Sequence, residues 1–202
     1  MTDSAVRTLE RYEARMALYR SLGYDRLAAV CSALDRLGPL EGEVLDVGTG
    51  QGLLAIELAR RGASVTSIDA SAAEQRVGVA NAGHQGLAGR ITFLTVDARR
   101  TPFGDGVFVA VTILDALHHF EEGASVFAEV RRVLAPAGRV LLAEMTPEGF
   151  ALIEHVHASE GRVHPVGPVT LEAAVHWFTS RGFRLLTLDE QHLHLVAVLT
   201  TP

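Results

Sequence analysis

The sequence contains no lysine, so all 18 of its basic residues are arginines. This absence excludes Schiff-base and pyridoxal chemistry and a lysine general base, because each needs a side-chain amine. Cys31 is the single cysteine, which excludes an internal disulfide and a cysteine-based zinc site and favours a reducing compartment. No window approaches 18 uninterrupted apolar residues, and the first ten residues lack a signal-peptide pattern. We therefore expect a cytoplasmic protein without stable membrane insertion.

Positive charge is also scarce, since the formal net charge is -6 and the sequence pI is about 5.8. A nucleic-acid-binding surface needs clustered cations to neutralise phosphates, so we expect no nucleic-acid partner and a small-molecule substrate instead. With 202 residues, 48% of them hydrophobic, the chain is long enough for one well-filled core. We therefore predict a single domain over residues 1–202, and the sequence leaves the oligomeric state open.

The chain is organised around a glycine-rich segment at residues 43–52. Its first five residues alternate apolar side chains as a short buried strand does, and an apolar helical pattern begins at Leu53. Between them, Gly48, Gly50 and Gly52 permit a sharp turn and let a ligand approach the backbone without meeting a Cβ atom. Free N–H groups at the start of the helix face the same place. The pattern predicts a strand, a tight turn and a helix that together form a ligand site.

Strand and helix patterns alternate from residue 43 onward with short connections between them. Such alternation is typical of a mostly parallel sheet with helices on both faces, so we predict a doubly wound, Rossmann-like α/β fold. Ligands bind such sheets outside the carboxyl ends of the strands, where the glycine turn lies. The expected strands are 43–47, 64–68, 91–96, 107–114 and 138–144, and the expected helices are 51–61, 71–82 and 121–135.

The first 37 residues precede this alternation and carry a helical apolar pattern that Gly23 interrupts. We expect residues 1–37 to form a helical cap on the domain. Its tyrosines, Tyr12, Tyr19 and Tyr24, either line a substrate pocket or pack the helices against the sheet.

The end of the chain has a different pattern of elements. A helix is expected over 170–181, followed by strands over 183–188 and 191–199 with Asp189-Glu190 as the turn between them. Because so short a connection requires antiparallel neighbours, we predict that the mostly parallel sheet ends in an antiparallel hairpin.

Aspartates lie at or near the ends of four expected strands. Asp46 precedes the glycine turn, where a carboxylate would repel a phosphate, so it indicates a cationic ligand. Asp69 follows the first glycine by 21 residues, close to the spacing of a carboxylate that accepts hydrogen bonds from ribose hydroxyls. Asp97 and Asp115 end the third and fourth strands. Aspartate is common at strand ends and helix caps, which explains any one of these residues but explains all four together poorly.

The motifs taken in order resemble those of class I S-adenosylmethionine-dependent methyltransferases. They are most similar to the small-molecule branch that includes ubiquinone/menaquinone C-methyltransferases, also called type 11. The segments that carry the resemblance are 44–52, 67–71, 96–103, 116–120 and 132–140. The resemblance implies a seven-stranded sheet and methyl transfer from S-adenosylmethionine, with S-adenosylhomocysteine as product, to a small acceptor by in-line displacement.

The resemblance also implies which residues bind the methyl donor. The glycine turn faces the methionine part, Asp69 holds the ribose hydroxyls, Asp97 with Ala98 recognises adenine, and Leu114 closes over the donor. A sulfonium donor without phosphate needs nearby acids and helix N–H groups rather than a basic cradle, which agrees with this set. The residues expected to bind the donor are Asp46, Gly48, Thr49, Gly50, Gly52, Asp69, Ala70, Asp97, Ala98 and Leu114.

Histidines offer the candidate catalytic groups. His118 and His119 follow the fourth strand at the ligand end of the sheet, where either residue can serve as a general base if the acceptor must lose a proton. Packing or capping of the loop is the alternative for both. On the last strand, His192 and His194 are expected to share one polar face, and we assign them no function.

Residues 145–170 form an expected lid or insertion, and the sequence indicates no clear element there. This segment holds imidazoles and carboxylates of the kinds that bind zinc or iron, but a His-x-His pair is a weak metal motif. We therefore expect no metal site and a substrate-facing or solvated insertion. The candidate ligands considered are Glu154, His155, His157, Glu160 and His164.

Two other function classes fit parts of the sequence. An NAD-dependent oxidoreductase is disfavoured because Leu53 replaces the third glycine of the Gly-x-Gly-x-x-Gly spacing and Asp46 would face a phosphate. A non-catalytic S-adenosylmethionine-binding module would bind the donor tightly without transferring its methyl group. Methylation of nucleic acid is disfavoured because the chain lacks an Asn/Asp-Pro-Pro-Tyr segment and a Pro-Cys pair.

Overall fold

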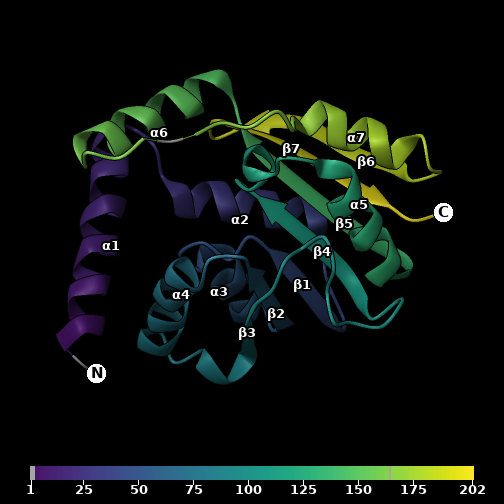
Figure 1. The fold of residues 1–202 in the computed structure, drawn as a ribbon, viewed down its shortest axis with the longest axis horizontal. Coiled ribbons are helices and arrows are strands. Elements are labelled where there is room, and N and C mark those ends of the chain that lie inside the picture. Colours follow the sequence, from purple (N-terminus) through teal and green to yellow (C-terminus); the bar gives the residue numbers. More distant parts are fainter. Residues whose placement is uncertain (1–2, 164) are drawn as a thin grey trace.

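The computed structural model describes residues 3–163 and 165–202, and at its centre lies a seven-stranded sheet of order β3-β2-β1-β4-β5-β7-β6 (Figure 1). The first five strands in this order are parallel, while β7 runs antiparallel to both β5 and β6. The predicted fold class is therefore confirmed. The strands are β1 (Glu43–Val47), β2 (Ser64–Asp69), β3 (Ile91–Thr95), β4 (Phe108–Leu114), β5 (Leu134–Met145), β6 (Arg184–Gln191) and β7 (His194–Thr200).

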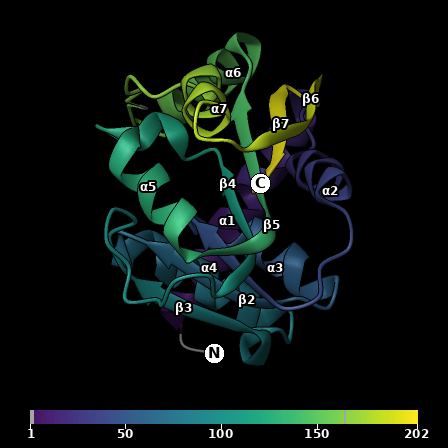
Figure 2. The same ribbon diagram turned by 90° about the vertical axis from the view of Figure 1, so that its right-hand side faces the viewer.

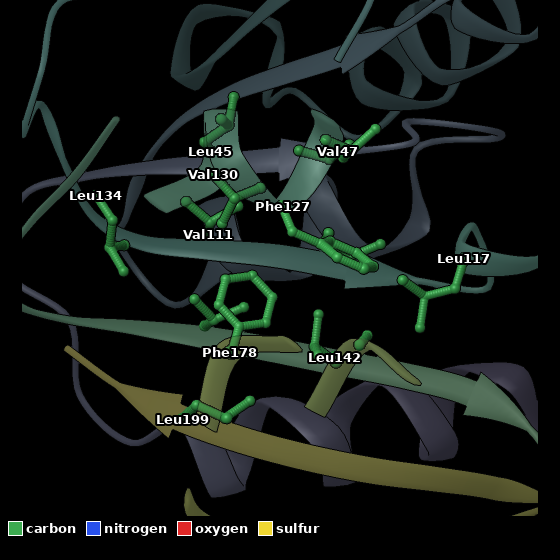
Figure 3. Close-up of a cluster of buried hydrophobic side chains, with 14 of the residues drawn as sticks. Leu45, Val47, Val111, Leu117, Phe127, Val130, Leu134, Leu142, Phe178 and Leu199 are labelled. Atoms are coloured by element: carbon green, nitrogen blue, oxygen red, sulfur yellow. The ribbon is translucent and has the colours of Figure 1, made fainter. Parts of the chain in front are cut away.

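Helices cover both faces of the sheet because its central strands are apolar on both sides (Figure 2). In β1, Val44 packs with α2 and α3, whereas Leu45 and Val47 point to the opposite face and pack with α5 and α7 (Figure 3). The covering helices are α2 (Arg26–Leu37), α3 (Leu53–Arg60) and α4 (Ala72–His84) on one face and α5 (Gly123–Val133) and α7 (Leu171–Thr179) on the other.

Two further helices lie outside these layers, α1 (Asp3–Ser21) and α6 (Pro147–Ser159). Figure 1 shows α6 lying across one end of α1. A third apolar cluster joins them, in which Tyr19 of α1 and Val156 of α6 are buried with Met145 at the carboxyl end of β5. The predicted helical pattern is confirmed from residue 3 to residue 37 as α1 and α2, separated by a turn at Gly23 (φ +83°) and by the N-cap Asp25, while residues 1 and 2 lie outside the described residues. Residues 147–159, where no clear element was expected, are helical.

The hairpin of β6 and β7 turns three residues later than predicted. Asp189 and Glu190 remain in the ladder opposite Val196 and Leu195, so the prediction of a turn at these acids is wrong. The turn is formed by His192 and Leu193, which both have positive φ angles (+46° and +63°) as a tight two-residue hairpin turn requires. The carbonyl of Leu193 accepts a hydrogen bond from the N–H of Thr146 (2.8 Å), so the turn is held against the start of α6.

None of the helices in residues 3–163 and 165–202 has the length and apolar character needed to cross a membrane.

Candidate active site

Two adjoining cavities open at the carboxyl ends of the parallel strands. The larger, of about 480 Å³, is bounded by the glycine turn and by α1, α2 and α6, and we call it the helical lobe. The smaller, of about 350 Å³, is bounded by the loops that follow β2, β3 and β4, and we call it the loop lobe. Both lobes are lined by the same five residues, so they form one continuous site: Gly48, Asp69, Ala70, Ala116 and His119.

The three glycines of the turn have different surroundings. A Cβ atom on Gly48 would lie 2.7 Å from the Cβ of Ala116, and a Cβ on Gly52 would lie 2.8 Å from the Cα of Gly78 in α4. A Cβ on Gly50 would instead meet only a carbonyl oxygen at 3.9 Å, so open space lies over its backbone. Gly48 and Gly50 line the helical lobe together with Thr49, whereas Gly52 lines neither lobe and allows close packing of the turn on α4.

Asp69 stands between the two lobes at the end of β2. Its two carboxylate oxygens accept hydrogen bonds from the N–H of Gly50 (2.9 Å) and the N–H of Ser71 (2.7 Å). These contacts tie the end of β2 to the glycine turn and fix the direction of the carboxylate. Ala70 follows it and lines both lobes.

Asp46 lies behind the cavity wall and lines neither lobe. It faces its register partners on the two neighbouring strands, Ser67 and Thr112, whose hydroxyls donate to its carboxylate at 2.7 and 3.1 Å. The Ser67 hydroxyl also contacts the hydroxyl of Thr49 in the glycine turn at 2.7 Å. Burial raises the pKa of Asp46 to about 6, although the two hydroxyl hydrogen bonds oppose this. A polar layer across three strands thus connects Asp46 to the turn.

The residues after β3 line the loop lobe. Asp97 is exposed, and the guanidinium of Arg99 hydrogen bonds to its carboxylate at 2.6 Å, which holds the pKa of Asp97 below its ordinary value. Ala98 lines the same lobe and packs against the apolar core, while Leu114 at the end of β4 lines the helical lobe.

Asp115 differs from the other strand-end aspartates because it faces the helical lobe and a pair of cationic side chains. One of its oxygens accepts from Nη2 of Arg26 (2.8 Å), and the other contacts Nε2 of His194 (2.7 Å). Burial alone would raise the pKa of Asp115, but the charges of His194 and Arg26 hold it well below its ordinary value. The residue adopts a positive φ of +53°, which directs its side chain to these partners from α2 and β7.

His118 is buried beside the helical lobe and is held by Glu144, a buried carboxylate near the end of β5. Nδ1 of His118 lies 2.8 Å from Oε2 of Glu144, and the backbone N–H of His118 donates to the same oxygen (3.1 Å). The second oxygen of Glu144 accepts from the N–H of Met145 (3.0 Å). An imidazole whose Nδ1–H is held by a carboxylate is fixed in tautomer and orientation, as in general bases of the histidine–acid type.

His119 is exposed, lines both lobes and packs its ring 4.1 Å from that of His118. Burial and the charge of His118 lower the pKa of His119. Both histidines predicted from the sequence thus lie at the site, and His118 is the one that contacts a carboxylate, that of Glu144.

The candidate metal ligands of residues 145–170 point to different surroundings. Glu154 and His155 are exposed on α6, while Glu160 pairs with Arg15 through two hydrogen bonds of 2.7 and 2.8 Å. His157 lines the helical lobe. In the described part of the chain no three His, Cys, Asp or Glu side chains group as metal ligands do, and His164 lies outside the described residues.

Three residues of the site were missed by sequence reasoning: Arg26, Glu144 and His194. Glu144 carried a signal, since it is a charge within the apolar run 140–145 of β5. His194 was expected to share a polar strand face with His192, but that expectation is wrong: His192 lies in the turn, and His194 is buried against Asp115. Arg26 gave no signal, because its partner is 89 residues away in the sequence.

The sequence left open whether the tyrosines of residues 1–37 line a pocket or pack the helices, and the structure shows both arrangements. Tyr12 and Tyr19 line the helical lobe, and Tyr24 packs near His194 with ring centroids 6.0 Å apart. Tyr19 is also buried in the cluster of α1 and α6, so it contributes to packing and to the lobe at once.

Comparison with known proteins gives matches over the same segments. The sequence profile described as "Methyltransferase domain" matches residues 45–142. A ubiquinone/menaquinone biosynthesis C-methyltransferase of Geotalea daltonii is 33% identical over 57% of this chain and 51% of that protein. A demethylmenaquinone methyltransferase of Mycobacterium marinum is 37% identical over 68% of this chain and 56% of that protein. The chain therefore spans about half the length of the curated relatives that it matches.

The fold is also similar to solved structures. A glycopeptide N-methyltransferase crystallised with S-adenosylmethionine superposes with a TM-score of 0.68 at 18% identity, covering 87% of this chain and 94% of that chain. At this level of identity the likeness concerns the fold.

Proposed function

Because the chain belongs, through residues 45–142, to the methyltransferase domain family of class I S-adenosylmethionine-dependent enzymes, we propose that it transfers a methyl group from S-adenosylmethionine to a small-molecule acceptor. One observation carries the proposal: the glycine turn and Asp69 stand between two connected lobes at the carboxyl ends of the strands. Such a site holds a two-part donor at its centre and leaves the part of the helical lobe beyond the glycine turn for an acceptor.

The residues present suit this donor. Open space over Gly50 lets a ligand lie directly on the backbone, as the methionine part requires. The Asp69 carboxylate, oriented by two backbone N–H groups, keeps lone pairs for ribose hydroxyls. In this proposal adenine occupies the loop lobe beside Asp97 and Ala98, and Leu114 packs against the donor from the helical lobe. Asp46 acts indirectly, through Ser67 and Thr49, by holding the turn in place.

S-adenosylmethionine supplies an electrophilic methyl group on a sulfonium cation, which an acceptor displaces in line to leave S-adenosylhomocysteine. The chain contributes alignment of the two molecules and exclusion of water by α1 and α6, which supply much of the rate in such a displacement. When the acceptor atom carries a proton, His118 is placed to accept it. Glu144 keeps Nδ1 protonated, so that the other ring nitrogen serves as the basic one.

The curated relatives are named for quinone-type acceptors, but this chain spans only about half of their length. The wall of the helical lobe that faces the glycine turn is formed by α1, α2, α6 and the segment after α6, which lie outside the matched residues 45–142. In this proposal the acceptor is therefore chosen by these elements of the chain. The helical lobe of about 480 Å³ suits a small organic acceptor beside the methionine part of the donor.

The proposal is tested by calorimetric titration of the protein with S-adenosylmethionine, S-adenosylhomocysteine and NAD, repeated on Asp69→Ala. We expect micromolar binding of the first two and no binding of NAD, with affinity reduced about 100-fold in Asp69→Ala because two hydrogen bonds to a charged group are lost. Methyl transfer from radiolabelled donor to a panel of small acceptors then separates an enzyme from a non-catalytic binding module. Preference for NAD, or an unchanged affinity in Asp69→Ala, would overturn the assignment.

A further inference from the structure

The helical lobe is lined by charged side chains of both signs. Two carboxylates, Asp69 and Glu74, belong to the side formed by the end of β2 and the start of α4, where the donor is proposed to bind. The lobe is also lined by arginines from α1, α2 and the segment after α6, namely Arg15, Arg26 and Arg162. In a chain with a net charge of -6, three arginines around one cavity wall are a local excess of positive charge.

Two of these arginines contact the same carboxylate. Arg15 makes a bidentate pair with Glu160 at 2.7 and 2.8 Å, and Arg162 reaches the same side chain at 3.5 Å. Arg26 contacts a different carboxylate within the described residues, Asp115, and shares it with His194.

The hydrogen bonds of His194 show which cation Asp115 neutralises. Nε2 of His194 faces the Asp115 carboxylate at 2.7 Å, and Nδ1 faces the carbonyl of His192 at 3.1 Å. Both partners are acceptors only, so both ring nitrogens must carry a proton and the imidazole is a cation. In agreement, the pKa of His194 is raised: burial lowers it, but the charge and hydrogen bond of Asp115 outweigh burial. The charge of Asp115 is thus balanced by His194, and the positive charge of Arg26 is left in excess.

The guanidinium of Arg26 is also placed to bind a ligand. It lines the helical lobe and lies 5.6 Å from the ring centroid of Tyr19, which limits its rotation. A guanidinium has five N–H donors, and the bond to Asp115 uses only part of this set. The planar fork suits two oxygens of one anion better than an ammonium does.

We propose that Arg26 binds an oxyanion of the methyl acceptor, so that the substrate is a small molecule with an ionised carboxylate, phenol or enol group. The identification of the ligand as the methyl acceptor rests on the proposed methyl transfer, but the anion site itself is independent of it. Asp115 and His194 are positioning residues in this arrangement, since they hold Arg26 at the wall of the lobe while leaving its charge unbalanced.

Matched pairs of probes test the anion site by calorimetry, with and without saturating S-adenosylhomocysteine. Salicylate is compared with salicylamide, and 4-nitrophenolate with 4-nitroanisole, so that the two arms separate a carboxylate from a phenolate. We expect at least one anion to bind about tenfold more tightly than its neutral partner. Arg26→Gln is expected to reduce this preference to threefold or less, and Arg26→Lys to keep part of it.

Two further variants keep the result interpretable. Asp115→Asn keeps an oxygen that accepts from Arg26 and a residue that adopts the positive φ. Because the pKa of His194 falls when the Asp115 charge is lost, the net charge beside Arg26 stays the same, and the anion preference should be kept, in contrast to Arg26→Gln. Arg61→Gln removes an equal charge from a surface pair with Asp35, outside both lobes, and should leave the preference unchanged. Thermal unfolding verifies that each variant is folded.

The outcomes separate this inference from the proposed function. Equal binding of the members of both pairs, absence of anion binding at the solubility limit, or a preference that survives in a folded Arg26→Gln protein overturns the anion site. Failure to bind S-adenosylhomocysteine, with the anion preference intact, overturns the proposed methyl transfer and leaves the anion site standing.

Discussion

The loop lobe and the helical lobe meet at the same five residues but are built in different ways. The loop lobe is formed by residues 47–126, within a single run of strand ends and the loops that follow them. The helical lobe adds side chains from α1, α2 and α6, including tyrosines and arginines whose partners lie far away in the sequence. The donor side of the site, which consists of the loop lobe and the glycine turn, is therefore shaped largely by the course of the backbone. The rest of the helical lobe is shaped by side chains that tertiary packing brings together.

This difference has a physical consequence for specificity. A surface built from backbone N–H groups and a sharp turn changes little when neighbouring side chains are substituted, because the groups that contact the ligand belong to the chain itself. A surface built from long side chains changes with each substitution. Donor binding is thus expected to be robust and acceptor choice variable, and the following variants test that contrast.

The largest effect is expected at the turn itself. Gly48→Ala would place a Cβ 2.7 Å from that of Ala116 at a φ of +87°, so we expect a loss of about 3 kcal/mol in unfolding free energy and at least 100-fold weaker binding of S-adenosylhomocysteine. Gly62→Ala is the matched control, because its φ is +93° but nothing lies within 4 Å of the new Cβ. It should lose only about 1 kcal/mol and keep donor affinity. Equal losses of donor affinity in both variants would contradict a specific role for the turn.

A second test concerns turnover, which the histidine beside the helical lobe should control. His118→Ala is expected to reduce kcat by about 100-fold or more with an acceptor that must lose a proton, and Glu144→Gln by about tenfold, because the oriented base is lost or mispositioned. Donor affinity should change less than threefold in both. His119→Ala serves as the control, with kcat within about threefold of the parent. Full turnover across the pH range in both histidine variants would remove the base from the mechanism.

The polar layer under the glycine turn predicts a pH effect on stability. The pKa of Asp46 is about 6 in the folded protein against an ordinary value of 3.8, so the folded state keeps a proton that the unfolded chain loses between these values. Stability contributed by this group is present below pH 4 and is lost as the pH rises to about 6, by up to about 3 kcal/mol. In Asp46→Asn we expect urea unfolding to lose this slope. Wild-type and variant curves that stay parallel from pH 4 to 7 would refute the assignment.

The smallest effect is expected at the rim of the loop lobe. Arg99 occupies the Asp97 carboxylate that the proposed adenine contact requires, and both side chains are exposed. Arg99→Ala should therefore tighten S-adenosylhomocysteine binding by about two- to threefold, whereas Asp97→Ala should weaken it. Calorimetry at low and high salt measures both, and a weaker affinity in Arg99→Ala would place the arginine among the donor contacts.

The same division explains what the sequence could predict. Short stretches of sequence encode the glycine turn, the strand that precedes it and the strand that ends at Asp69. The alternation of strands and helices and the centre of the site could therefore be predicted from local patterns. The antiparallel hairpin followed from the short connection, but its turn did not. Two-residue turns with positive φ angles usually contain glycine or asparagine, whereas this turn contains His192 and Leu193. The contact of the turn with the start of α6 overrides that local preference.

The helical lobe could not be predicted in the same way. The fourth aspartate, Asp115, resembles the other three in the sequence, yet its charge is directed to Arg26 and His194 by contacts across 89 and 79 residues. Glu144 is the exception, since a charge inside the apolar run of β5 stands out in the amino-acid sequence itself. Hydrophobic patterns with a period of two in strands or 3.6 in helices indicate which face of the element is buried. They do not indicate which buried polar side chains contact one another.

The link from Arg26 to Asp115 to His194 also sets an order of events during synthesis. Arg26 is synthesised 168 residues before His194, which at roughly 5–20 residues per second is a delay of about 8–34 seconds. The strands around the glycine turn have all been made by then. A nascent chain thus acquires the parts of its donor side well before it can complete the wall around Arg26, and a chain cut short before β7 would lack that wall while retaining the turn.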